Sequence, residues 1–194
     1  MDYKGFEDYL AKYTAYSLGD LSKKCVLEIQ NEKIESFDFS KYDLNNSFFV
    51  DVEFDSCNFK GVYLSGSFFC GSSLRDCVLE DNTLRKAEWN AMTFWQTTIK
   101  RLDAFRTSFM RDIFQHCVFQ DCKIGVKCSF SLSNFEDVFF DNCVFEWAFL
   151  YKARYTNVRF RNCHFIDTEL PVGFDVEKAS CSEEYCYSSP ENTD

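Results

Sequence analysis

Residues 143–165 read CVFEWAFLYKARYTNVRFRNCHF, and a large apolar side chain recurs there at every fifth position. The same spacing extends from Ile34 to Leu170, with one extra residue between Ile124 and Phe130. It gives 28 positions, all apolar or aromatic, which we call anchors. A helix repeats every 3.6 residues and a strand every two, so neither keeps a five-residue period on one side. A chain that turns a corner every five residues does, and each side of a square coil then buries one anchor.

A second inward position lies two residues before each anchor, and small side chains predominate there. Seven of the eleven cysteines occupy this inward slot: Cys57, Cys77, Cys117, Cys122, Cys128, Cys143 and Cys163. A large anchor beside a small partner fills a narrow interior at the density of folded proteins. We interpret these thiols as small hydrophobic side chains. Metal or redox chemistry between thiols on adjacent coils is the alternative, although the absence of a CxxC pair disfavours zinc.

This spacing resembles that of the pentapeptide-repeat family, A-(D/N)-L-x-x, in which Phe often replaces Leu. The resemblance is closest in SFFVDVEFDSCNF, residues 47–59, and in residues 143–165, and it covers residues 34–170. It implies an all-β fold, a right-handed quadrilateral β-helix with four pentapeptides in each coil. The 28 anchors would then form about seven coils.

We expect three segments along the chain. Residues 1–33 would form an N-terminal helix and a lead-in strand that cap the solenoid, because an open end exposes unpaired backbone and apolar side chains. Residues 34–170 form the β-helix. Residues 171–194 would form a C-terminal cap and an acidic tail, disordered from about Ser180. The extra residue near Gly125 is interpreted as a one-residue bulge at a corner, with a recognition feature as the alternative.

The formal charge of −10 disfavours direct binding to nucleic acid. Residues 34–170 hold 19 acidic and 15 basic side chains, so much of the excess negative charge lies in the C-terminal tail. The first ten residues contain no apolar run typical of a signal peptide, and no stretch of the chain is long and apolar enough for a membrane span. We therefore expect a cytoplasmic protein that does not bind membranes.

Candidate catalytic side chains are few and scattered. His116 and His164 fall on outward positions of different sides, so neither is placed in a Ser–His–acid or Cys–His unit. Asp112 falls in an inward slot, where a carboxylate is costly unless it is paired. We expect either a distorted coil there or compensation by Arg111 and backbone amides. No glycine-rich phosphate loop is present. The sequence thus predicts no enzyme, and no catalytic, cofactor-binding or metal-binding residue.

Exposed aromatic side chains form the candidate partner surface. The register places seven of them outward: Phe48, Phe68, Trp95, Phe105, Trp147, Phe149 and Tyr151. Phe48 and Phe68 share one side of the coil with Phe149 and Tyr151, which lie farther along. Large exposed apolar patches usually mark contacts. For Phe48 and Phe68 the alternative is that the N-terminal helix folds back over them.

The function predicted from these features is a non-enzymatic module for protein–protein interaction, with a protein partner. The resemblance offers a sharper alternative, because some pentapeptide-repeat proteins mimic DNA, bind DNA gyrase or topoisomerase IV, and protect it from quinolones or peptide toxins. Those proteins show an acidic face and dimerise, whereas the acids of this chain are mixed with bases such as Lys60 and Arg101. Another alternative is an immunity or effector protein that binds a partner through the aromatic patches. A homodimer is a further alternative.

Overall fold

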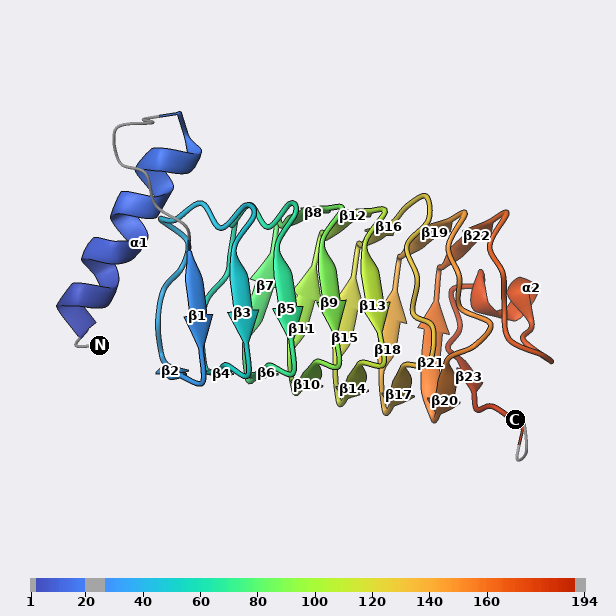
Figure 1. Cartoon of the computed structure of the whole chain (residues 1–194). Helices are drawn as coiled ribbons and strands as arrows, with labels where there is room; N and C mark the ends of the chain where they lie inside the picture. The colour runs from blue at the N-terminus through green and yellow to red at the C-terminus, as the bar shows by residue number, and fades with distance from the viewer. Residues whose placement is uncertain (1–2, 20–26, 191–194) are drawn as a thin grey trace.

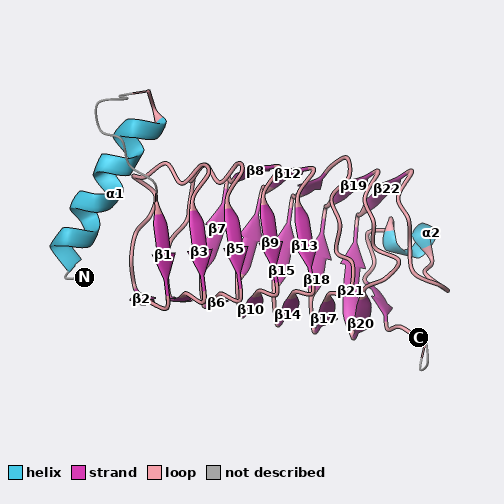
Figure 2. Cartoon of the chain, in the orientation of Figure 1, coloured by secondary structure: helices cyan, strands magenta, loops and turns pink. Residues whose placement is uncertain are grey.

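The computed structural model describes residues 3–19 and 27–190. Its main body is a stack of β-coils, with helix α1 (Tyr3–Ser17) at one end and the short helix α2 (Val176–Ala179) at the other (Figure 1). Short strands form the sides of the coils and loops form the corners (Figure 2). The longest sheet has seven strands, one from each coil, which confirms the predicted β-helix of about seven coils.

Four sheets form the four sides, which we number in chain order. The first side contains β1 (Glu28–Gln30), β3 (Phe48–Val50), β5 (Phe68–Cys70), β9 (Glu88–Asn90) and β13 (Ser108–Met110). The second contains β2 (Lys33–Glu35), β4 (Glu53–Asp55), β6 (Ser73–Arg75), β10 (Thr93–Trp95), β14 (Ile113–Gln115), β17 (Asn134–Glu136) and β20 (Arg154–Thr156). The third contains β7 (Val78–Glu80), β11 (Thr98–Lys100), β15 (Val118–Gln120), β18 (Phe139–Asp141), β21 (Val158–Arg161) and β23 (Tyr185–Tyr187). The fourth contains β8 (Thr83–Arg85), β12 (Asp103–Phe105), β16 (Lys123–Ile124), β19 (Val144–Glu146) and β22 (His164–Ile166).

Each coil stacks its anchors directly on those of the next. Phe49 pairs with Phe69, and Phe94 with Phe114, at a separation of 20 residues. Phe114 pairs with Phe135 at 21, because the extra residue intervenes. The rings of Phe94 and Phe114 are stacked with their centroids 4.4 Å apart. All but three of the 28 predicted anchors are buried in one continuous core. The remaining three lie at the two ends of the series and pack against the same core: Ile34, Phe165 and Leu170.

The first coil begins earlier than the sequence predicted. Ile29 in β1 pairs with Phe49 of β3 and so acts as the first anchor. Leu27 is buried in the inward slot two residues before it. The expected lead-in strand is therefore part of the β-helix itself, and the residues that precede it, 20–26, lie outside the described residues.

Most corners contain a residue in the left-handed region two positions after the anchor. The φ angle is 55° at Asn31, 53° at Asp51 and 54° at Trp147. Asn, Asp and Gly are common at these corners because they adopt positive φ at the lowest cost. At Gly66 a Cβ atom would lie 2.3 Å from Asn46 Oδ1, so a larger residue there would displace that side chain. The sequence of the corners thus follows from the same period as the core.

The extra residue is accommodated at the corner after β16, where the sequence placed a bulge. Gly125 N donates to Ala104 O (2.8 Å), and Cys128 N donates to Gly125 O (3.1 Å). A Cβ atom on Gly125 would lie 3.0 Å from Ala104 O, so the close approach of two coils favours glycine. The ladder resumes in register on the second side after this corner.

The C-terminal segment is ordered where the sequence predicted disorder. β23 pairs antiparallel with β21, which places Tyr185 opposite Phe160. The ring centroid of Phe174 lies 5.0 Å from that of Phe160, in an edge-to-face contact. Aromatic side chains of this segment therefore cover the anchors of the last coil. The expected disorder from about Ser180 is wrong for residues 180–190, and the last four residues lie outside the described part of the chain.

Helix α1 caps the N-terminal end of the solenoid. Leu10 and Tyr13 are buried, and Phe6 meets Phe37 edge to face with centroids 5.0 Å apart. Phe48 remains 44% exposed, so the alternative in which this helix covers the first aromatic pair is wrong. Among the described helices, none has the length and apolar character needed to cross a membrane.

Candidate interaction surface

The first two predicted surface residues form a small patch on the first side. Phe48 of β3 pairs with Phe68 of β5, and their ring centroids are 6.0 Å apart. Phe48 is exposed and Phe68 is half-buried. Val50, also on β3, is half-buried, and the outward position after Phe68 on the next coil is Glu88. The patch therefore spans two coils and ends at a charged side chain.

A second group of predicted residues, the C-terminal aromatic patch, consists of Trp147, Phe149 and Tyr151. Trp147 lies at the corner between the fourth and first sides of one coil, and Phe149 lies on the first side, where it is bridged to Ser129 and Glu169 of the neighbouring coils. Trp147 is 54% exposed and Tyr151 is 42% exposed, whereas Phe149 is half-buried. Backbone hydrogen bonds to the neighbouring coils hold Trp147 and Phe149 in place, and Tyr151 lies in the turn that follows.

Neighbouring side chains enlarge the C-terminal aromatic patch. Trp147 N donates to Ile166 O (2.9 Å), and the side chain of Ile166 is exposed beside it. Lys152 Nζ lies 5.1 Å from the centroid of the Tyr151 ring. A bulky residue at positive φ is unusual, so the corner holds Trp147 at a conformational cost. Exposed Trp and Tyr with a cation nearby are the side chains that contribute most to protein–protein contacts.

Trp95 and Phe105 belong to neither patch. Trp95 ends β10 and is half-buried, because the ring of His116 meets it edge on at 4.7 Å and the Arg75 guanidinium lies 5.8 Å from its centroid. Phe105 ends β12, is also half-buried, and has the Arg106 guanidinium 5.4 Å from its ring. The structure thus divides the seven predicted residues between two patches on one side and two separate rings on other sides.

Charged side chains of opposite sign face one another along the third side. Glu80 pairs with Lys60 of the preceding coil (3.0 Å) and with Arg101 of the next, and Arg161 contacts Asp141 (2.8 Å). Hydrogen bonds from Lys60 and Arg101 lower the pKa of the Glu80 carboxyl, and one from Arg161 lowers the pKa of Asp141. Exposed pairs of this kind contribute little to stability. Their main consequence is that bases interrupt the row of acids on this side.

Asp112 is fully buried in the inward slot of the second side. Its Oδ1 accepts a hydrogen bond from Met92 N of the preceding coil (2.9 Å), whereas Oδ2 has no partner within the described chain. Burial raises the pKa of this carboxyl well above its ordinary value. The ladder is regular at this point, with Asp112 N donating to Ser133 Oγ (2.9 Å). A backbone amide, and not a distorted coil, therefore accommodates the acid.

The inward thiols are part of the core. Burial raises the pKa of Cys117 and of Cys128 to about 11, so both stay protonated at neutral pH. On the surface, His116 Nδ1 lies 3.5 Å from Asp137 Oδ2. Within the part of the chain that the structure describes, no three His, Cys, Asp or Glu side chains gather as a metal site.

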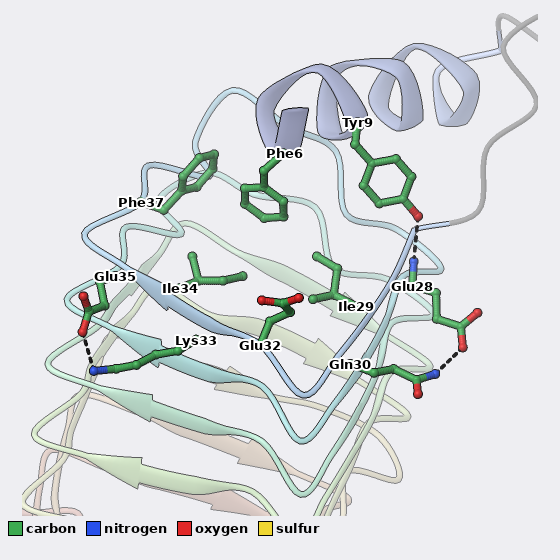
Figure 3. A pocket seen from close by; sticks show the side chains of 10 residues that line it. All are labelled: Phe6, Tyr9, Glu28, Ile29, Gln30, Glu32, Lys33, Ile34, Glu35 and Phe37. Atoms are coloured by element: carbon green, nitrogen blue, oxygen red, sulfur yellow. Dashed lines mark hydrogen bonds and ion pairs between the residues drawn. The ribbon is translucent and has the colours of Figure 1, made fainter. Parts of the chain in front are cut away.

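The sequence did not indicate a pocket of about 360 Å³ that lies between α1 and the first coil (Figure 3). Its lining includes Phe6, Tyr9, Ile29, Glu32, Ile34 and Phe37. The Glu32 carboxylate lies at the centre of the view in Figure 3, between Ile29 and Ile34. The signal that could have drawn attention to this end is Glu32, which stands two residues before the anchor Ile34, in an inward slot that is otherwise mostly small.

Residues 38–69 match the family described as pentapeptide repeats, in eight copies. A search of curated proteins finds no significant match. Among solved structures, a trypsin-treated variant of QnrB1, a plasmid-mediated fluoroquinolone resistance protein, is 16% identical, with a TM-score of 0.48, over 78% of this chain and 86% of that one. The pentapeptide repeat protein Rfr23 from the cyanobacterium Cyanothece 51142 is 10% identical, with a TM-score of 0.47, over 66% and 97%. HetL, a pentapeptide repeat protein involved in heterocyst differentiation regulation from Nostoc sp. strain PCC 7120, is 11% identical, with a TM-score of 0.28, over 82% and 95%.

Proposed function

We propose that this chain, a pentapeptide-repeat protein, is a non-enzymatic module that binds another protein through the C-terminal aromatic patch. The observation that carries the proposal is the exposure of Trp147 and Tyr151 on one rigid coil, beside the exposed Ile166. Burying large aromatic side chains from a fixed backbone costs little conformational entropy and supplies much of the energy of a protein contact. The buried thiols and the scattered histidines supply no reactive group to this surface.

A pull-down from the native source, followed by binding of the purified partner, tests this surface. We expect Tyr151→Asp to weaken binding of that partner at least tenfold, because a charge replaces a ring at the centre of the contact. Tyr63→Asp is the matched control, since Tyr63 is also an exposed tyrosine, 58% exposed, on the fourth side of the N-terminal half. Equal recovery of the partner by wild type and Tyr151→Asp, with both variants folded, would remove this surface from consideration.

The principal alternative is a DNA mimic that binds DNA gyrase or topoisomerase IV. That function requires an acidic face, and the pairs of Glu80 with Lys60 and Arg101 weigh against one on the third side. A supercoiling assay with purified gyrase separates the two functions. We expect no change in supercoiling at micromolar protein, whereas inhibition, or protection of the enzyme from a quinolone, would favour the alternative.

A second copy of this chain is another occupant that the aromatic patch could accept. Sedimentation of wild type and Tyr151→Asp at equal concentration addresses it. A dimer that Tyr151→Asp converts to a monomer would assign the patch to self-association, whereas a monomer in both cases leaves it for a different protein.

A further inference from the structure

The N-terminal end of the β-helix exposes backbone groups that α1 satisfies in part. Three hydroxyl side chains of the helix reach the first coil. Glu28 N donates to Tyr9 Oη (3.2 Å), and Asp43 N donates to Thr14 Oγ1 (3.0 Å). Tyr13 Oη donates to Asn45 O. These contacts lie on the first and fourth sides of the coil. The second side, which begins with β2, lies at the mouth of the pocket (Figure 3).

Among residues 3–19 and 27–190, no strand lies beside the outer edge of β2, since β2 ends its sheet there and pairs with β4 alone. In the next coil, Glu53 N donates to Glu32 O (2.9 Å), and Asp55 O accepts a hydrogen bond from the coil before it. The equivalent groups of the first coil are Lys33 N–H and Glu35 C=O. Both point away from β4, and no described residue pairs with either. Such an edge is a template for an added strand.

The inward slot of the second side shows how a strand lying on β2 would be recognised. In this column, Ser72 Oγ accepts a hydrogen bond from Val52 N (3.0 Å), and Asp112 Oδ1 accepts one from Met92 N (2.9 Å). The side chain in the slot thus bonds the backbone amide of the coil stacked before it. Glu32 occupies the same slot in the first coil, and its carboxylate is exposed at the centre of the pocket.

The walls of the pocket add an apolar site and a negative charge. Ile34 is the outermost anchor of its column and is only partly buried, and Ile29 lies beside it. Glu28, Glu32 and Lys33 stand around the mouth, where Lys33 is already paired with Glu35. The carboxylates of Glu28, Glu32 and Glu35 outnumber the single ammonium group of Lys33, so the mouth of the pocket is negatively charged. This charge favours a ligand with basic side chains.

We propose that the N-terminal end of the solenoid binds an extended peptide segment of another protein, added as a strand along β2. A large apolar side chain of that segment packs on Ile34, and Lys or Arg residues flank it and face Glu28, Glu35 and the open end. The Glu32 carboxylate accepts a hydrogen bond from the backbone of the segment, as Asp112 does from Met92. The C-terminal end of a second copy cannot supply this strand by stacking, because β23 and its tyrosines already cover it.

Fluorescence anisotropy with a fluorescein-labelled peptide, Gly-Thr-Arg-Leu-Arg-Thr-Gly, tests this site on the full chain, because arginines adjacent to the leucine point outward as Glu35 does. We expect a micromolar Kd for wild type. Glu32→Lys should weaken binding at least tenfold, because it removes the acceptor and reverses the charge at the centre of the pocket. Glu88→Lys, the same charge change at an exposed position of the first side, should leave the Kd within twofold. Replacing the leucine of the peptide by alanine should also weaken binding at least tenfold.

Each outcome either supports the site or overturns it. Absence of binding at 1 mM peptide, or equal Kd values for wild type and Glu32→Lys, would refute the proposal. A dimer in sedimentation that Glu32→Lys dissociates would assign this end to a second copy and refute it as well. Tyr151 lies on another coil, so Tyr151→Asp should not change the peptide Kd. The proposals for this site and for the C-terminal aromatic patch are therefore tested independently.

Discussion

The two ends of this β-helix are closed in different ways. At the C-terminal end, β23 adds a strand to β21, Phe174 covers Phe160 and Phe165, and Tyr187 covers Tyr155. At the N-terminal end, α1 lies across the first coil and pairs with it through side-chain hydroxyls, while no strand of the described residues pairs with the outer edge of β2 beside the pocket. Both ends of a solenoid expose strand edges, and an edge that the chain itself does not pair is available to a strand of another protein.

The largest effect should come from removing the C-terminal closure. A chain that ends at residue 172 exposes the last coil and loses Phe174, Tyr185 and Tyr187, each of which buries an aromatic ring worth about 1.5–3 kcal/mol. We expect the free energy of unfolding to fall by about 5 kcal/mol in urea titrations. Removing residues 191–194 alone is the control and should change nothing. A similar loss from both truncations would mean that these three rings do not close the solenoid.

The next largest effect concerns Asp112, which occupies the same inward slot of the second side as Glu32. Unlike Glu32, it is covered by coils on both sides, so its carboxyl is buried. Burial raises its pKa, so the native state keeps a proton that the unfolded chain releases above about pH 4. Stability therefore falls as pH rises above that value, by about 1.4 kcal/mol per unit until the native pKa is reached. Asp112→Ser should remove this loss, since Ser72 and Ser133 already occupy the same column.

Urea unfolding of wild type and Asp112→Ser between pH 4 and pH 8 measures the difference. The variant should be the more stable protein at pH 7, by a margin that shrinks toward pH 4. Asp121→Ser, the same substitution at an exposed corner, is the control. A margin independent of pH would mean that Asp112 is charged in the folded protein.

The repeated part of the fold was predictable from the sequence, because each anchor meets the same environment as the one 20 or 21 residues away. Packing of Phe94 on Phe114 and of Phe114 on Phe135 requires only that the period be kept. The extra residue near Gly125 was visible as a break in that period. Most corners repeat in the same way, with a residue of positive φ two positions after the anchor, and Asn, Asp and Gly are common there.

The ends and the surface were less predictable, because contacts there occur once. Tyr185 and Tyr187 lie in an acidic, Ser-rich segment whose composition resembles disorder, and nothing in the period indicates that they pair with β21. Trp95 is outward by register, yet His116 and Arg75 cover part of it from neighbouring coils. The pocket at Glu32 required knowing where α1 lies, which the sequence did not establish.

A smaller effect is expected at the N-terminal end, where the helix makes fewer ring contacts. Phe6→Ala removes a partly buried ring that packs on Phe37 and Phe39, and we expect a loss of about 1–2 kcal/mol. Phe174→Ala at the other end should cost about 3 kcal/mol, since that ring meets both Phe160 and Phe165. Urea titrations of the two variants compare the ends directly. A larger loss for Phe6→Ala would mean that the helical cap is the stronger of the two closures.

The smallest expected effect is an increase in stability. Trp147→Asn places a residue that tolerates positive φ at a strained corner, and we expect the protein to become more stable by about 0.5–1 kcal/mol. The same change should weaken binding of the protein partner, because it removes a ring from the C-terminal aromatic patch. Asp167→Asn, at the equivalent corner of the next coil, is the control and should alter neither property. A loss of stability in Trp147→Asn would mean that the ring supports the fold.

Hydrogen exchange of individual backbone amides, followed by NMR, measures the difference between the two ends most directly. The amide of Lys33 on the outer edge of β2 should exchange within seconds at neutral pH, whereas those of Asn162 and Cys163, which donate to Cys181 O (2.8 Å) and Ala179 O (3.0 Å) in the C-terminal closure, should be protected at least a hundredfold. Equal protection at both ends would show that β2 is already covered, and the N-terminal end could then accept no strand.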